Sequence, residues 1–251
     1  MNINSLQTIQ FRNLYPQQRS NIYFLSSKSG NDVFVKSTEN YTNSQEIKEA
    51  KAELIKQAKY LSDKNLTAGS GGNISTRVGD KILISTAGSM FSDLTENDIA
   101  IVDKNGKSLD THKPSSETPM HLEIYKQRPD VNAIIHYHPV YATVYAVANK
   151  TMLPNILPHT TKHFHDLKVA PYKNAGSEEL ATETAKELGT SEAILLGNHG
   201  ALVVGKTLKI AAKTADSLEN YAHISYLLEN SNFKVNHLSD SNVNYMLSKN
   251  K

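Results

Sequence analysis

Residues 73–86, NISTRVGDKILIST, contain two short runs of strand-forming residues on either side of Gly79 and Asp80. Branched apolar residues favour strands, and a Gly-Asp pair between two such runs is typical of a tight hairpin turn. A second segment of this kind, IAIVDKNGKSL at 99–109, has Asn105 and Gly106 at its turn. Because hairpins join antiparallel strands, the two segments predict a sheet that is mainly antiparallel.

Helical patterns are interspersed with the strands. Residues 43–64 start with Asn43 and Glu46, which resemble a capping box, and then show apolar residues at helical spacing. The run SSETPMHLEIYKQRPD at 115–130 predicts a helix started by Ser116. Further helices are expected at 177–188 and 207–228, and further strands at 131–139, 193–196 and 201–204. The mixture predicts an α/β domain that is not doubly wound.

The composition narrows the class of partner. The 251 residues carry 27 basic and 25 acidic side chains, a net charge of +2, which provides no broad basic field for nucleic acid or an anionic membrane. A small molecule is the expected partner. No cysteine is present, so a transition-metal site would have to use His, Asp or Glu. The sequence shows neither a secretory signal nor an apolar run of about 18 residues, and a cytoplasmic location is expected.

The first 42 residues differ from the rest. They are rich in Asn, Ser and Gln but contain NIYFLSS and DVFVKS around a turn-like stretch at 28–31. This pattern fits a hairpin and equally fits a partly disordered arm. We therefore expect an N-terminal extension at 1–42 and a main domain at 43–251.

Three histidines have the spacing of a metal site. His136 and His138 are two apart in the strand predicted at 131–139, so their side chains project from the same face. His199 lies in a glycine-flanked turn between two apolar strands. Packed or surface histidines are the alternative for each residue taken alone. Three imidazoles with an open fourth position fit catalytic zinc, although nickel, cobalt and manganese also accept these ligands.

Glu117 is the candidate acid or base. It lies at the start of the helix predicted after KPSS, where free amides and serine hydroxyls favour an anion. A favourable interaction with the helix dipole is the simpler explanation. A carboxylate beside a metal can also move a proton at an acidified carbon. His121, four residues along the same helix, is interpreted as structural.

Two loops have the composition of a phosphate site. The segment Gly69–Asn73 is rich in glycine, and Ser85–Gly88 ends a strand with hydroxyl groups and a further glycine. Backbone amides in such loops bind anions, but plain turns have the same composition. Neither loop alone identifies a ligand.

Taken together, GSGGNIS, LISTAG, KPSSE, IIHYHP and LLGNHGALVVG resemble, in order and spacing, the motifs of the class II aldolase/adducin family. The resemblance covers about residues 46–230. It implies a three-layer α/β/α fold with a mainly antiparallel sheet, and a homotetramer with active sites between subunits. It also implies a zinc-dependent lyase that cleaves a ketose phosphate through an enediolate.

The resemblance assigns roles to individual positions. His136, His138 and His199 correspond to the zinc ligands, and Glu117 to the catalytic acid/base. The phosphate cradle would consist of Gly72, Asn73, Ala87, Gly88, Ser115 and Ser116. Ala87 stands where the aldolases usually have threonine, which removes one side-chain donor.

Two differences from the sequence pattern of the aldolases leave the type of reaction open. The tyrosine that the aldolases have after the H-x-H strand is absent from MLPNILPHTTKHFH at 152–165. His159, His163 or His165 would replace it, unless they form a surface cluster, and Tyr245 is a weak candidate for a second, C-terminal tyrosine. A dehydratase, a decarboxylase and a 4-epimerase of sugar phosphates are the alternatives within the fold. The epimerases have Asp at the position of Glu117, which makes them less favoured. A metal-free, adducin-like interaction domain would be expected to have lost the ligands.

Overall fold

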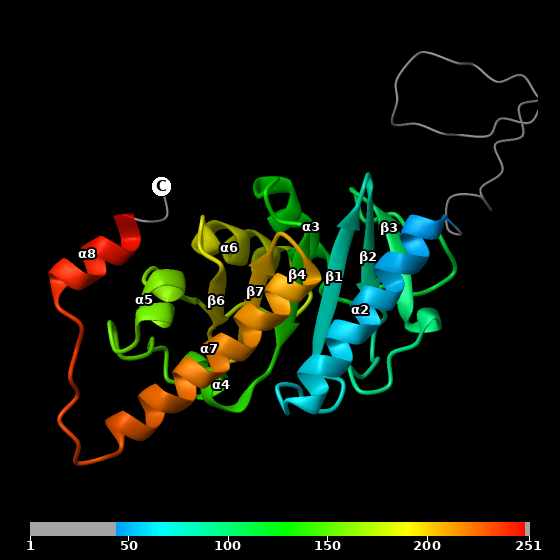
Figure 1. Cartoon of the computed structure of the whole chain (residues 1–251). Coiled ribbons are helices and arrows are strands. Elements are labelled where there is room, and N and C mark those ends of the chain that lie inside the picture. The colour runs from blue at the N-terminus through cyan, green and yellow to red at the C-terminus, as the bar shows by residue number, and fades with distance from the viewer. Residues whose placement is uncertain (1–43, 249–251) are drawn as a thin grey trace, which may run out of the picture. The chain divides into compact units, whose positions relative to one another are not determined.

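The computed structural model describes residues 44–248, and its centre is a seven-stranded sheet in the order β3-β2-β1-β4-β7-β6-β5 (Figure 1). The strands are β1 (Gly72–Val78), β2 (Lys81–Ser85), β3 (Ile99–Asp103), β4 (Ala133–Tyr137), β5 (Val169–Ala170), β6 (Ala193–Leu196) and β7 (Gly200–Gly205). Every neighbouring pair is antiparallel except β5 and β6. The prediction of a mainly antiparallel sheet is confirmed.

The first hairpin forms as expected, and the second only in part. β1 and β2 pair from Val78 and Lys81 onward, and Gly79 has a positive φ of 59° in the turn. After β3 the returning chain pairs with that strand only through an isolated bridge, between Val102 and Ser108. The carboxylate of Asp110 accepts the amide of Ile101 at 3.0 Å, so a side chain replaces part of the expected second strand.

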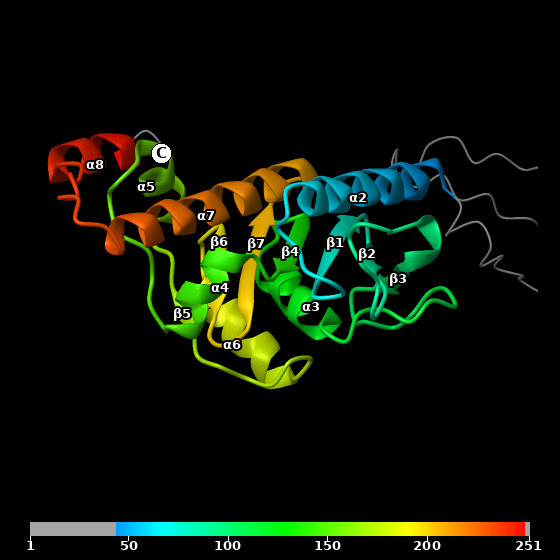
Figure 2. The same ribbon diagram turned by 90° about the horizontal axis from the view of Figure 1, so that it is seen from below.

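Helices cover both faces of the sheet. They are α2 (Gln45–Asp63), α3 (Thr118–Gln127), α4 (Val140–Val147), α5 (Pro158–Phe164), α6 (Glu178–Leu188), α7 (Leu208–Glu229) and α8 (Asp240–Ser248), with a 3-10 turn, η1, at Glu96–Asp98. One hydrophobic cluster joins the sheet to α2, α4 and α7, and a second joins it to α3 and α6. Figure 2 shows α2 and α7 on one side of the sheet and α3 and α6 on the other. The expected three layers are therefore present.

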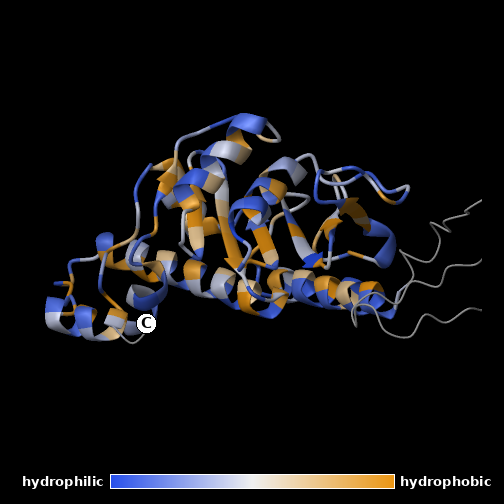
Figure 3. Cartoon of the chain, turned by 90° about the horizontal axis from the view of Figure 1, so that it is seen from above, coloured by the Kyte–Doolittle hydropathy of each residue, from blue (hydrophilic) through white to orange (hydrophobic). Residues whose placement is uncertain are grey.

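Because side chains alternate between the two faces of the sheet, a single strand contributes residues to both hydrophobic clusters. In β4, Ala133, Ile135 and Tyr137 belong to the cluster under α2, α4 and α7, whereas Ile134 belongs to the one under α3 and α6. Figure 3 shows hydrophobic residues concentrated on the strands. Because successive side chains point to opposite faces, His136 lies on the same face as Ile134.

Side-chain caps start two of the predicted helices where expected. Ser177 accepts the amide of Leu180 at the start of α6, and Thr207 accepts that of Ile210 at the start of α7. In α3 the predicted start was wrong, because the helix begins at Thr118 and not at Ser116. The Ser115 carbonyl and hydroxyl accept the amides of Thr118 and Glu117, so residues 115–117 form a turn that precedes the helix.

Helix α4, which the sequence patterns did not predict, begins directly after the second histidine of the H-x-H pair. Its N-cap residue is Pro139, which provides no side-chain acceptor. The carboxylate of Glu219, from α7, accepts the amides of Tyr141 and Ala142, each at 2.8 Å. This contact satisfies donors at the helix start that would otherwise be unpaired. It also ties the chain after His138 to α7.

The hairpin expected within residues 1–42 and the cap expected at Asn43 lie outside the described residues. Among residues 44–248, no helix combines the length and apolar composition needed to cross a lipid bilayer.

Candidate metal centre

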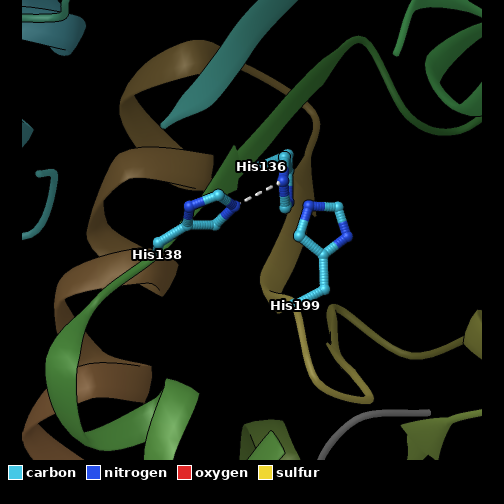
Figure 4. A group of neighbouring side chains, drawn as sticks. All are labelled: His136, His138 and His199. Atoms are coloured by element: carbon cyan, nitrogen blue, oxygen red, sulfur yellow. Dashed lines mark hydrogen bonds between the residues drawn. The ribbon is translucent and has the colours of Figure 1, made fainter. Parts of the chain in front are cut away.

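The histidine triad consists of His136, His138 and His199, whose donor atoms all lie within 4.8 Å of one another. His136 is in β4, His138 directly follows it, and His199 ends the turn between β6 and β7. Figure 4 shows the three rings turned toward one another. Within residues 44–248, this is the one group of three or more histidine and acidic side chains close enough to share an ion. The structure thus brings together the three histidines singled out in the sequence.

A backbone contact fixes the tautomer of His136. Its Nδ1 lies 2.9 Å from the carbonyl oxygen of Ala201 in β7. A carbonyl only accepts hydrogen bonds, so Nδ1 carries the proton and Nε2 presents its lone pair to the centre of the triad. Complete burial, together with the neighbouring rings of His199 and His138, holds the pKa of His136 well below its ordinary value. The ring is therefore neutral, as a metal ligand must be.

Two glycines create the space that His138 occupies. A Cβ on Gly71 would lie 2.6 Å from Nδ1 of this ring, and a Cβ on Gly200 would lie 2.5 Å from Cδ2. Both distances are too short for any side chain. The glycine loop before β1 and the glycine after His199 are thus required by the position of a histidine, apart from any contact with a ligand.

Glu117 places a carboxylate against the triad. Its Oε2 lies 3.2 Å from Nε2 of His136, and its Oε1 lies 3.5 Å from Nε2 of His199. The Asn73 side chain donates to Oε2 at 2.8 Å. Glu117 is 6% exposed, and a buried carboxylate normally needs partners for both oxygens. Here Oε1 accepts no hydrogen bond.

The donor set fits a divalent cation. Nε2 of His136 and Nε2 of His138 are only 3.0 Å apart, and two facing lone pairs repel each other unless a proton or an ion lies between them. The unpaired Oε1 of Glu117 borders the same space. Three nitrogen donors and one carboxylate suit zinc and other borderline transition metals, whereas calcium and magnesium prefer oxygen ligands.

The residues predicted to bind phosphate lie close together in the fold. Gly72 and Asn73 are paired with Tyr137 and His136 across β1 and β4. The chain after β2 runs beside the KPSS segment, because Ala87 donates to the carbonyl of Lys113 and Ser115 to that of Ser85. Ala87, Gly88 and Ser116 are exposed and Ser115 is buried. Their role as a phosphate cradle stays a prediction.

The Asn73 side chain makes contacts that the sequence patterns did not predict. Besides donating to Glu117, its Oδ1 lies 2.6 Å from Nε2 of His121, which is fully buried. Burial lowers the pKa of His121 to about 3, so the ring is neutral. A sequence signal existed, since Glu117, directly before α3, is followed at intervals of four residues by His121 and Tyr125, and Asn73 and Ser75 are two residues apart in β1.

The candidate substitutes for the missing tyrosine lie on peripheral helices. His163 contacts Glu192 at 2.9 Å, and His159 lies 3.3 Å from Ser217. His165 caps the end of α5. Tyr245 lies on α8, which packs on α5, and is 64% exposed. None of these residues belongs to the triad's group, and their catalytic role stays untested.

Comparison with known proteins gives a consistent assignment. The profile for the Class II Aldolase and Adducin N-terminal domain matches residues 52–226. The L-fuculose phosphate aldolase of Methanocaldococcus jannaschii is 38% identical over 177 residues, covering 70% of this chain and 96% of that protein. The 3-oxo-tetronate 4-phosphate decarboxylase of Haemophilus influenzae is 30% identical over 195 residues, covering 76% of this chain and 92% of that protein.

A solved structure of an L-fuculose 1-phosphate aldolase superposes with a TM-score of 0.74 at 36% identity, covering 80% of this chain and 95% of that one. The profile match, the relatives and the superposition agree with the resemblance that the motifs suggested, and the histidine triad is complete. The chain therefore belongs to the class II aldolase and adducin N-terminal domain family, as a metal-dependent enzyme of the class II aldolase type.

Proposed function

We propose that the protein is a zinc-dependent lyase that reversibly cleaves a ketose phosphate by an aldol reaction. The main supporting observation is that Oε1 of Glu117 accepts no hydrogen bond although it lies in a buried site beside three histidines. A carboxylate oxygen kept free at this position is available to a substrate proton. The similarity to aldolases acting on L-fuculose phosphate supports the substrate class.

In this proposal His136, His138 and His199 hold the zinc ion. When bound, zinc supplies Lewis acidity, which withdraws electron density from substrate oxygens and lowers the barrier to breaking the neighbouring carbon-carbon bond. The hydrogen bond from His136 to Ala201 keeps its Nε2 available. Gly71 and Gly200 leave the space that the His138 ring occupies.

Glu117 is assigned the proton transfer. In the cleavage direction it delivers a proton to the carbon left by the departing aldehyde, and in synthesis it removes the same proton. The loops carrying Gly72, Asn73, Ala87, Gly88, Ser115 and Ser116 are proposed to hold the substrate phosphate. Ser115 and Ser116 would contribute hydroxyl groups, and the glycines would allow close approach of the backbone.

A decarboxylase acting on a sugar-acid phosphate is the second candidate. The 30% identity to the Haemophilus influenzae enzyme supports it, and the same site would stabilise the anion left by carbon dioxide. A dehydratase and a 4-epimerase require similar anions and remain further alternatives.

Product analysis is the decisive experiment. Protein loaded with zinc is expected to release an aldehyde and dihydroxyacetone phosphate from one or more ketose 1-phosphates, measured with a coupled aldehyde assay. Parallel reactions with 3-oxo acid phosphates would be followed for carbon dioxide. Carbon dioxide without aldehyde would replace the aldolase by the decarboxylase, and turnover of neither class would contradict the proposal.

The proposal includes a cytoplasmic homotetramer with active sites between subunits. Helix α4, next to the triad, exposes Val140, Val144 and Val147 by 65%, 42% and 55%. Their spacing places them along one side of the helix, where an apolar stripe is typical of a protein contact.

Val144→Asp is expected to shift the protein toward monomers, because a charge would be buried at the subunit contact. Light scattering coupled to size exclusion would measure the mass. Lys150→Asp, beyond the end of α4, is the control and should leave the mass unchanged. A monomeric wild type would contradict the tetramer.

A further inference from the structure

We propose that His121, Ser75 and Tyr125 act as positioning residues that hold the Glu117 carboxylate in its reactive orientation through the Asn73 amide. This inference rests on the proposed proton transfer by Glu117. The four residues behind Glu117 form a continuous buried chain of hydrogen bonds between β1 and α3, called here the polar seam.

The contacts of the polar seam are short throughout. The Asn73 amide donates to Glu117 Oε2 at 2.8 Å, and its Oδ1 lies 2.6 Å from His121 Nε2. Ser75 Oγ lies 2.7 Å from His121 Nδ1 and 2.8 Å from the Tyr125 hydroxyl. All five residues are at most 6% exposed, so water does not compete for these bonds.

The donors and acceptors of these groups give the hydrogen bonds of the polar seam one direction. Asn73 donates its amino group to Oε2 of Glu117 and therefore turns its oxygen toward His121. His121 must then carry its proton on Nε2 and accept from Ser75 at Nδ1. Burial raises the pKa of Tyr125, which keeps its hydroxyl protonated and able to donate to Ser75. Each member thus fixes the orientation of the next.

The polar seam does not conduct protons. An amide neither gives up nor accepts a proton readily, so Asn73 separates Glu117 from His121 as far as proton transfer is concerned. Its effect is geometric. Oε2 is held by Asn73, and Oε1 is left without a hydrogen bond on the side of His199. The two oxygens therefore have different tasks, one anchored and one free to react.

Matching repeats explain how the polar seam forms. His121 and Tyr125 are separated by four helical residues, about 6.0 Å, and Asn73 and Ser75 by two strand residues, about 6.7 Å. Glu117, four positions before His121, is the residue that immediately precedes the helix. A helix lying along a strand therefore brings the two sets into alternating contact. Arg77, the next residue of the strand series, covers the Tyr125 ring at 4.7 Å and closes the far end.

The main test compares His121→Leu with His121→Gln. Leucine removes both hydrogen bonds of the ring, whereas the glutamine amide can still donate to Asn73. His121→Leu is expected to lower kcat about 10- to 100-fold with KM and zinc content unchanged, because a displaced carboxylate slows proton transfer. His121→Gln should restore most of the loss. Ser75→Ala and Tyr125→Phe, milder changes farther along, should cause smaller decreases in kcat.

A control separates positioning from general stability. Thr184→Val alters a fully buried hydroxyl group in α6 that has no hydrogen-bond partner and lies outside the polar seam. It should leave kcat unchanged. Equal kcat in wild type and all His121, Ser75 and Tyr125 variants would overturn the proposal. The proposal would also be overturned if the decrease in kcat of His121→Leu were not restored in His121→Gln. A decrease in kcat that is fully explained by a loss of folded protein or of bound zinc would overturn it as well.

A structural readout keeps this inference separate from the proposed reaction. Nitrogen NMR of the wild-type protein should show His121 protonated at Nε2, and a crystal structure of His121→Leu should show the Glu117 carboxylate rotated. A ring protonated at Nδ1, or an unmoved carboxylate, would refute the polar seam even if sugar-phosphate cleavage is found. Absence of cleavage with both structural results as expected would refute the reaction alone.

Discussion

Glu117→Gln is expected to lower the rate at which the substrate proton at the reacting carbon exchanges with solvent by about 100- to 10,000-fold. Glutamine has nearly the same shape and can still accept from Asn73, so the fold and the triad should persist. It cannot take up or release the proton. The rate of proton exchange, followed by NMR in deuterated water with the substrate identified by product analysis, measures this loss.

Zinc content must be measured in the same samples. The expected result is a zinc stoichiometry like that of the wild type, because the three histidines are untouched. Glu123→Gln is the matched control: it changes a carboxylate of α3, the helix that follows Glu117, and this carboxylate contacts Lys126 and Gln127 at the surface. Proton exchange at the wild-type rate in Glu117→Gln would exclude Glu117 as the acid/base.

Gly71→Ala is expected to weaken zinc binding by about 100-fold, in the range found for residues that orient metal ligands. The new methyl group would lie 2.6 Å from Nδ1 of His138, so the imidazole must move away from its place beside His136. The measurement is competition with a chelator of known zinc affinity. Activity at saturating zinc should also fall, because the displaced ligand moves the ion.

Gly69→Ala provides the control within the same loop. Gly69 has a positive φ of 56°, and a Cβ there would meet nothing within 4 Å. Alanine should therefore reduce stability, by about 1 kcal/mol, without altering zinc affinity. Equal zinc affinity in Gly71→Ala and wild type would mean that His138 is not a ligand in the observed position.

The fold was predictable because its signals are local. The hairpin turn at Gly79 and the caps at Ser177 and Thr207 each use residues within a few positions of one another, and all three appear in the structure. Helix α4 was not predictable in this way. Its start is capped by Glu219, about eighty residues along the chain, and no local pattern reveals such a partner.

The same difference between local and long-range signals decides which parts of the candidate site could be predicted. His136 and His138 share a strand face, a property of spacing alone, and the motif around His199 is distinctive in sequence. The Asn73 side chain was assigned only to phosphate, because its contacts with Glu117 and His121 depend on how α3 lies along β1. The start of α3 was misplaced for a related reason, since the backbone carbonyl of Ser115 takes part in the turn before it.

The pairing of β4 with β7 links the triad to the unfolding of the whole domain. These strands are central in the sheet, and the bond from His136 to Ala201 spans them. Separating the triad thus requires opening the middle of the sheet, which is a global event. If an ion binds only the native triad, and its free concentration is a thousand times its Kd, it adds about 4 kcal/mol to the free energy of unfolding. Amide protons of the core strands should then exchange more slowly as free zinc rises, so that deuterium uptake would report metal occupancy.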